Sequence, residues 1–164
     1  MDPSLRRLLH QFKYHGWRRL APAFAHPMLP LLAGMPAEAV LVPVPLGRRR
    51  QRQRGYNQAA ELASALGRQA GVPVWPALLS RHRETGTQTR LGRAQRLANL
   101  AGAFRARATE RPVVLVDDVF TTGATLVSAA RALLDAGAPA VGAVTLARAE
   151  PPLAAEARRL FTTQ

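Results

Sequence analysis

Two adjacent aspartates followed by a short threonine-rich loop carry the clearest chemical signal in this sequence. Asp117 and Asp118 follow the four aliphatic residues 113–116, and residues 121–125 lead into a run with helical apolar spacing. Free N–H groups at a helix start and threonine hydroxyls can hold a phosphate. Carboxylates can accept hydrogen bonds from ribose hydroxyls, as one acid does in dinucleotide sites. The order of buried strand, acids, loop and helix therefore predicts a sugar-phosphate site.

Two other interpretations of this stretch are weaker. An ordinary strand–turn–helix with a capping threonine explains one threonine and neither acid. A nucleoside-triphosphate loop is disfavoured, because no Gly-Lys-Ser/Thr follows a glycine-rich run.

The composition is that of a globular domain with little capacity for metal ligation. The chain has 164 residues, 48% of them hydrophobic and 20% charged, which suits one domain with a sizeable core. No apolar run approaches the roughly 18 residues of a membrane span. The four histidines show no ligand spacing, and the absence of cysteine excludes disulfides and thiolate metal sites, so we expect no zinc.

The positive charge is concentrated in the middle of the sequence. The net charge is +13, and residues 46–107 hold thirteen arginines against two glutamates, a balance of +11. Arginine matches phosphate geometry better than lysine does. Five arginines within residues 48–54, with no acid among them, repel one another unless an anion is bound, although a solvated loop is the plainer alternative.

Apolar spacing and helix-breaking residues predict the order of elements. We expect an amphipathic helix after Asp2-Pro3, a helical stretch over 17–32 bent by its prolines, and a helix from Asn57 to about Gln69. Strands are expected at 39–42, near 78–79, at 113–117 and at 141–146. The remaining expected elements are a basic loop at 47–55 and helices near 93–98 and at 124–136.

This alternation predicts an α/β fold, a single Rossmann-like domain with a mainly parallel sheet. Its parts would be an N-terminal helical part at 1–38, a core at 39–150 and a C-terminal tail at 151–164. Ligands bind beyond the carboxyl ends of parallel strands, so the basic loop and the acidic loop should face one crevice. That polarity suits a ligand with a pyrophosphate on one side and a ribose 5-phosphate on the other.

The segment 113–125 resembles the motif with which type I phosphoribosyltransferases bind phosphoribosyl pyrophosphate (PRPP). The resemblance implies the type I phosphoribosyltransferase fold, with Asp117 and Asp118 facing the ribose hydroxyls and a bound Mg²⁺. The 5′-phosphate cradle would be Thr121, Thr122, Gly123, Ala124 and Thr125. We expect the pyrophosphate at Arg48, Arg54 and Gly55.

Three further blocks resemble the ComF family of competence proteins. They are Phe12-Lys13-Tyr14-His15-Gly16, then Val42-Pro43-Val44-Pro45 with Arg54-Gly55-Tyr56-Asn57-Gln58, and then Thr85, Gln88, Arg96 and Asn99 with Gly102-Ala103-Phe104. The resemblance implies a part in natural transformation on the cytoplasmic side, without membrane insertion. The partners would be incoming single-stranded DNA and other competence proteins such as a DNA-uptake helicase.

Two hypotheses on activity remain open at this point. Thr121 stands where purine-salvage relatives carry an acid, and a threonine cannot accept a proton near neutral pH. This favours a PRPP-binding protein that binds single-stranded DNA over an active transferase that moves ribose 5-phosphate from PRPP to an unidentified base or amine. No catalytic residue is assigned. The expected nucleic-acid contacts are Arg48, Arg49, Arg50, Arg52, Arg90 and Arg93. Tyr56 or Trp75 could stack on bases, and a core or rim role is an equal alternative for both.

Overall fold

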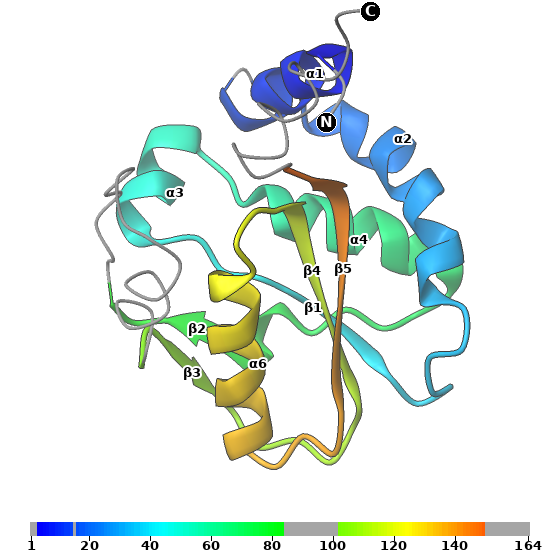
Figure 1. The fold of residues 1–164 in the computed structure, drawn as a ribbon, viewed down its shortest axis with the longest axis vertical. Coiled ribbons are helices and arrows are strands. Elements are labelled where there is room, and N and C mark those ends of the chain that lie inside the picture. The colour runs from blue at the N-terminus through cyan, green and yellow to red at the C-terminus, as the bar shows by residue number, and fades with distance from the viewer. Residues whose placement is uncertain (1–2, 15, 84–101, 150–164) are drawn as a thin grey trace, which may run out of the picture.

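A three-stranded parallel sheet forms the centre of the molecule (Figure 1). The computed structural model describes residues 3–14, 16–83 and 102–149. The strands are β1 (Val40–Pro43), β4 (Val113–Phe120) and β5 (Val141–Arg148), in the order β1-β4-β5 with both pairs parallel. A single parallel bridge joins Val74 to the free side of β1 at Leu41. This arrangement confirms the predicted α/β class and its mainly parallel sheet.

Helices cover both faces of this sheet. On one face lie α2 (Ala21–Ala25), the 3-10 helix η2 (His26–Leu32) and α4 (Gln58–Ala70), and on the other lies α6 (Ala124–Asp135) (Figure 1). Side chains alternate along β4, so Val114 and Val116 pack toward α4 while Val113 and Leu115 pack toward α6. Asn57 caps α4 as expected, because its side chain accepts a hydrogen bond from the N–H of Ala59.

The N-terminal part is helical and broken where prolines occur, as predicted. It contains α1 (Pro3–Tyr14), the short 3-10 helix η1 (Arg18–Leu20), α2 and η2. Phe12 anchors α1, since its fully buried ring packs edge-on against Phe24 at 5.3 Å and Tyr56 at 6.0 Å. The last turn of α1 is thereby held over the sheet.

The basic segment predicted as a loop is a helix, α3 (Arg48–Arg54). Arginine and glutamine are good helix formers, and this local preference outweighs the repulsion between the charges. Gly55 ends the helix with a left-handed φ of 76°, and its N–H donates to the carbonyl of Gln51. The five arginines of this segment therefore lie on a short helix and not on an open loop.

A small antiparallel sheet lies beside α6. It pairs β2 (Leu79–Arg81), which follows the 3-10 helix η3 (Pro76–Leu78), with β3 (Phe104–Ala106). The strand near 78–79 was expected, whereas β3 and its pairing were not. The helix expected near 93–98 lies outside the described residues. No helix in the described part of the chain is long and apolar enough to span a bilayer.

Candidate sugar-phosphate site

The two aspartates lie inside strand β4, not in the loop after it. β4 continues to Phe120, three residues beyond the predicted end, because it pairs with β5 as far as Phe120 and Arg148. Successive side chains of a strand point to opposite faces. Asp118 therefore shares the face of Val116, toward α1 and α4, and Asp117 shares the face of Leu115, toward α6.

Asp118 is buried and paired with a lysine from the N-terminal helix. The residue is 8% exposed, and its Oδ2 lies 2.9 Å from Nζ of Lys13. Lys13 is in the last turn of α1, where a cation also interacts favourably with the helix dipole. A carboxylate with so little contact with water needs such a partner, because desolvation penalises its charged form.

A raised pKa keeps the carboxyl group of Asp117 partly protonated near neutral pH. Burial, followed by the neighbouring charge of Asp118, raises the pKa of Asp117 to about 7. The N–H of Asp118, which donates to Oδ1 of Asp117 at 2.9 Å, opposes this rise, as do the charges of Lys13 and Arg54. The adjacent pair thus carries less than two negative charges near neutral pH.

Arg54 joins α3 to the same site. Its Nη1 donates to Oε1 of Gln58 at 2.9 Å and its Nη2 to the hydroxyl of Tyr14 at 3.2 Å. The guanidinium also lies 4.9 Å from the centre of the Tyr14 ring. Its Nε is buried and has no hydrogen-bond partner in the described part of the chain. Arg54 is therefore positioned by two side-chain hydrogen bonds, from its Nη1 and its Nη2, with its Nε left buried.

The loop after β4 ends at Gly123, directly before α6 begins. Gly123 has a left-handed φ of 76°, which favours glycine, and a Cβ there would lie 2.9 Å from the far end of the Phe120 ring. The hydroxyl of Thr122 accepts from the N–H of Ala124 at 3.5 Å, a weak cap at the start of α6. Thr121 is exposed and Thr125 partly buried. Backbone N–H groups at this helix start can thus receive a phosphate.

The other predicted contacts divide into exposed, buried and undescribed residues. Arg48, Arg49 and Arg52 are exposed on α3, and Arg50 is partly buried. Tyr56 is only 5% exposed, with the Arg18 guanidinium 4.6 Å from its ring centre, so it is a core side chain and no base can stack on it in this conformation. Arg90 and Arg93 lie outside the described residues.

Lys13 is the functional side chain that sequence reasoning missed. It belongs to the Phe12–Gly16 block, whose order had been recognised without assigning it a role. Its distance from Asp118 in the sequence hides the contact, and only the docking of α1 through Phe12 brings the two together.

We expect the Lys13–Asp118 pair to be energetically coupled. Lys13→Met leaves a buried carboxylate without its cation, so it should lower the free energy of unfolding by about 1–3 kcal/mol. Combining it with Asp118→Asn should cost less than the sum of the single changes, by about 1–2 kcal/mol. Urea unfolding at neutral pH measures this cycle.

The Arg18–Glu61 pair serves as the control. Its atoms are 3.9 Å apart and both side chains are more exposed, so Arg18→Met and Glu61→Gln should couple by less than about 0.5 kcal/mol. Additive costs for Lys13→Met and Asp118→Asn would mean that the buried pair is not a functional unit.

Comparison with known proteins identifies the family of this chain. Residues 53–160 match the family described as Phosphoribosyl transferase domain. The chain is 38% identical over 157 residues to DNA utilization protein YhgH of Salmonella typhi, an alignment that covers 89% of this chain and 68% of the relative.

Two relatives carry competence names. Identity is 39% over 114 residues to Competence protein F of Haemophilus influenzae, covering 66% of this chain and 50% of the relative. It is 33% over 152 residues to Competence protein ComFC of Bacillus subtilis, covering 90% and 61% respectively. The chain therefore belongs to the phosphoribosyl transferase domain family and, within it, to the ComF family of competence proteins.

Proposed function

We propose that this protein binds PRPP together with Mg²⁺ at the carboxyl end of β4, and that it acts in DNA uptake by binding single-stranded DNA. The observation that carries the first part is the acid pair directly before a glycine-dependent loop at a helix start. Lys13 and Arg54 supply cationic charge on the same side. A ligand with a phosphate at one end and a pyrophosphate at the other fits this distribution of charge.

The proposed ligand position follows from the chemistry of each group. The 5′-phosphate lies in the loop of residues 121–125, where the N–H groups of α6 begin. The ribose hydroxyls lie against Asp117 and Asp118. The pyrophosphate lies toward Arg54, Gly55 and Arg48, at the carboxyl end of β1.

The described residues could bind Mg²⁺ only together with the phosphates of PRPP. No group of three or more His, Cys, Asp or Glu side chains among them can hold a metal ion. Mg²⁺ commonly uses one or two protein carboxylates together with substrate phosphates, which Asp117, Asp118 and PRPP provide. When bound, the ion would neutralise pyrophosphate charge, while Lys13 and Arg54 orient the acids and the ligand.

The second part of the proposal rests on names and on charge. The relatives are named for competence and DNA utilization. A balance of +11 over residues 46–107 exceeds what one pyrophosphate needs. We propose that Arg48, Arg49, Arg50 and Arg52 on α3 contact the phosphates of single-stranded DNA. The protein would act in the cytoplasm, and its partners would be other competence proteins such as a DNA-uptake helicase.

An active phosphoribosyltransferase is the second candidate, favoured by the complete acid pair and loop. Thr121 is exposed and cannot take a proton from an acceptor base. We therefore expect pyrophosphate release from PRPP and Mg²⁺ to be no faster with a panel of bases and amines than without them. Release that depends on one acceptor would establish the transferase instead.

PRPP binding can be tested by calorimetry. The wild type should bind PRPP in Mg²⁺, and chelation of the metal should weaken that binding. Asp117→Asn with Asp118→Asn should weaken it at least about tenfold, because ribose and metal contacts are each worth one or more kcal/mol. Asp135→Asn is the matched control, since Asp135 is exposed at the other end of α6. Equal affinity of the double variant and the control would refute the assignment.

DNA binding can be tested by fluorescence anisotropy at several salt concentrations. Affinity for single strands should fall with salt by about 0.7 log units per log unit for each phosphate contacted. Replacing Arg48, Arg49 and Arg52 by serine should reduce that slope by about 2. If single strands, duplex and heparin compete equally for the protein, its interaction with DNA depends on net charge alone and is not specific for single strands.

A further inference from the structure

The two-stranded β2–β3 sheet has one buried and one exposed face. Leu79 and Phe104 point inward and pack in the core beside α6. Ser80 pairs with Arg105 on the opposite face, and Arg107 follows Arg105 at the two-residue spacing of a strand, about 7 Å further along. Both arginines are exposed. The alternation of the sheet thus turns their side chains to solvent.

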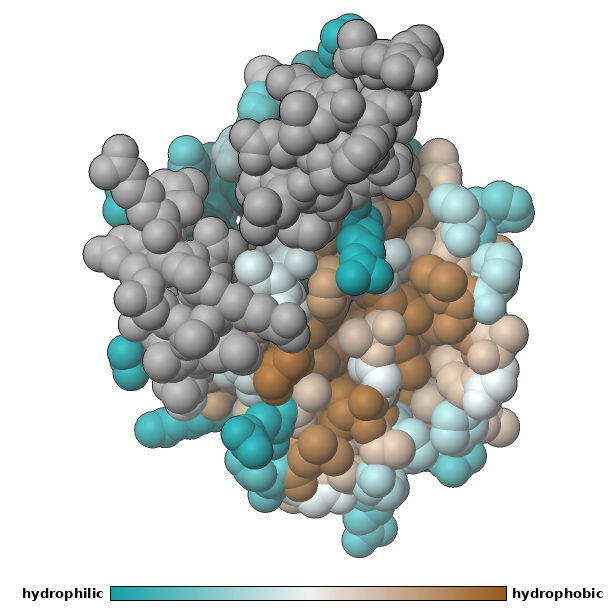
Figure 2. Space-filling model, viewed as in Figure 1, coloured by the Kyte–Doolittle hydropathy of each residue, from teal (hydrophilic) through white to brown (hydrophobic). Residues whose placement is uncertain are grey.

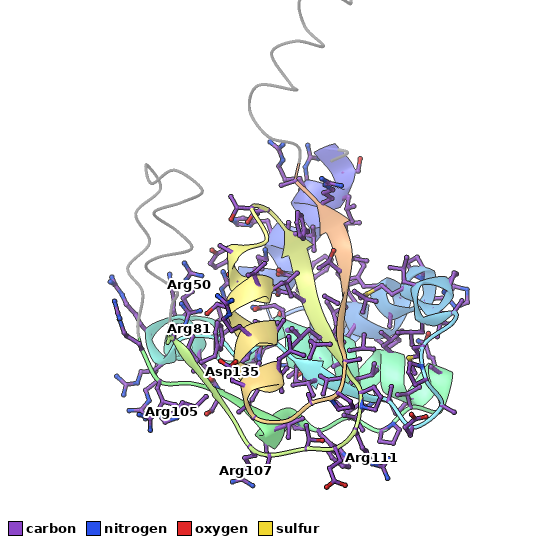
Figure 3. All side chains as sticks on the ribbon, turned by 60° about the horizontal axis from the view of Figure 1, so that its bottom comes forward. Arg50, Arg81, Arg105, Arg107, Arg111 and Asp135 are labelled. Carbon is purple, nitrogen blue, oxygen red and sulfur yellow. The ribbon has the colours of Figure 1, made fainter. Side chains whose placement is uncertain are left out.

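The surface around this sheet is strongly basic. Figure 3 shows Arg105, Arg107 and Arg111 along this side of the molecule, pointing outward. Asp135 is also labelled on this side in Figure 3, and the exposed Glu110 directly precedes Arg111 in the sequence. Within residues 3–14, 16–83 and 102–149, no ion pair includes Arg105, Arg107 or Arg111. Figure 2 shows the contrast with the apolar face over α6 and β5.

An exposed aromatic ring adjoins the arginines. Trp75 is 39% exposed, and the Arg111 guanidinium lies 5.3 Å from its ring centre. Two backbone hydrogen bonds connect Arg107 to Trp75 through Leu78. The N–H of Arg107 donates to the carbonyl of Leu78, and the N–H of Leu78 donates to the carbonyl of Trp75. An indole beside a guanidinium is a surface on which an unpaired base can stack.

This surface is remote from the sugar-phosphate site. Arg111 precedes the first residue of β4, whereas Asp117 and Asp118 lie near its other end, roughly 20 Å along the strand. Figure 3 shows Arg107 and Arg111 at the end of the molecule away from α1. A ligand here does not occupy the PRPP position.

We propose that Arg105, Arg107, Arg111 and Trp75 form a second surface that binds single-stranded nucleic acid independently of PRPP. The proposal rests on the DNA-binding part of the proposed function and adds its location. The arginines contact successive phosphates, and Trp75 stacks on a base. Duplex DNA offers the phosphates but not the base faces, so the surface prefers single strands.

Anisotropy with a labelled oligonucleotide of mixed sequence tests this surface. A variant with Arg105, Arg107 and Arg111 changed to serine should bind single strands at least tenfold more weakly, with a salt slope lower by about 2. Trp75→Ala should reduce the preference for single strands over duplex by at least threefold. The variant Arg49→Ser with Arg52→Ser keeps Arg48, the proposed pyrophosphate contact. Saturating PRPP with Mg²⁺ should change its binding to single strands by less than twofold.

Two controls separate a specific surface from net charge and from misfolding. Replacing Arg7, Arg19 and Arg68 by serine removes the same charge from exposed positions on α1, η1 and α4, and should change affinity less than threefold. Replacing Arg105, Arg107 and Arg111 by lysine keeps the charge and should retain most of the binding. Equal losses in the two serine variants would overturn the surface, as would loss of binding on adding PRPP. A wild type that binds no single strands would overturn the DNA-binding function itself, and this surface with it.

Discussion

The adjacent carboxylates of Asp117 and Asp118, the first partly buried and the second buried, govern the arrangement of charged side chains around the end of β4. Ionised carboxylates without partners in such a position would cost several kcal/mol each. The protein meets this cost in two ways. Lys13 forms an ion pair with Asp118 at 2.9 Å. Asp117 has a pKa of about 7, so it is largely protonated at lower pH. The site is therefore close to electrically balanced without a ligand, and a bound cation can take over the balancing charge.

This constraint explains why the N-terminal helix belongs to the site. Phe12 fixes α1 in the core, Lys13 reaches Asp118, and Tyr14 receives a hydrogen bond from Arg54. Three consecutive residues thus connect the core, the acid pair and α3. A change that loosens α1 would expose Asp118 and release Arg54 together, so the N-terminal block and the Arg54–Gln58 block act through one arrangement.

The sequence predicted those parts of the fold that depend on local signals. Runs of four aliphatic residues predicted the parallel strands. The Asn57 cap and the glycines after the helices predicted α4 and α6. It failed where neighbouring elements decide: β4 runs to Phe120 because β5 pairs with it there, and β3 exists because β2 provides an edge. The helix α3 was predicted as a loop, although its arginines and glutamines favour a helix. Lys13 was missed because its partner is distant in sequence. The sequence left Tyr56 open between stacking on bases and a core role, because its burial depends on packing against Phe12 of α1.

The number of protons released when PRPP and Mg²⁺ bind measures the charge balance of the acid pair most directly. Calorimetry near pH 6 in buffers of different ionisation enthalpy gives that number. Because Asp117 is mostly protonated below a pKa of about 7, a cation bound beside it should expel its proton. The wild type should then release up to about one proton more than Asp117→Asn, a difference that disappears above about pH 8. Equal proton release by the two proteins near pH 6 would contradict this account, because Asp117 would then either be ionised already or lie outside the binding site.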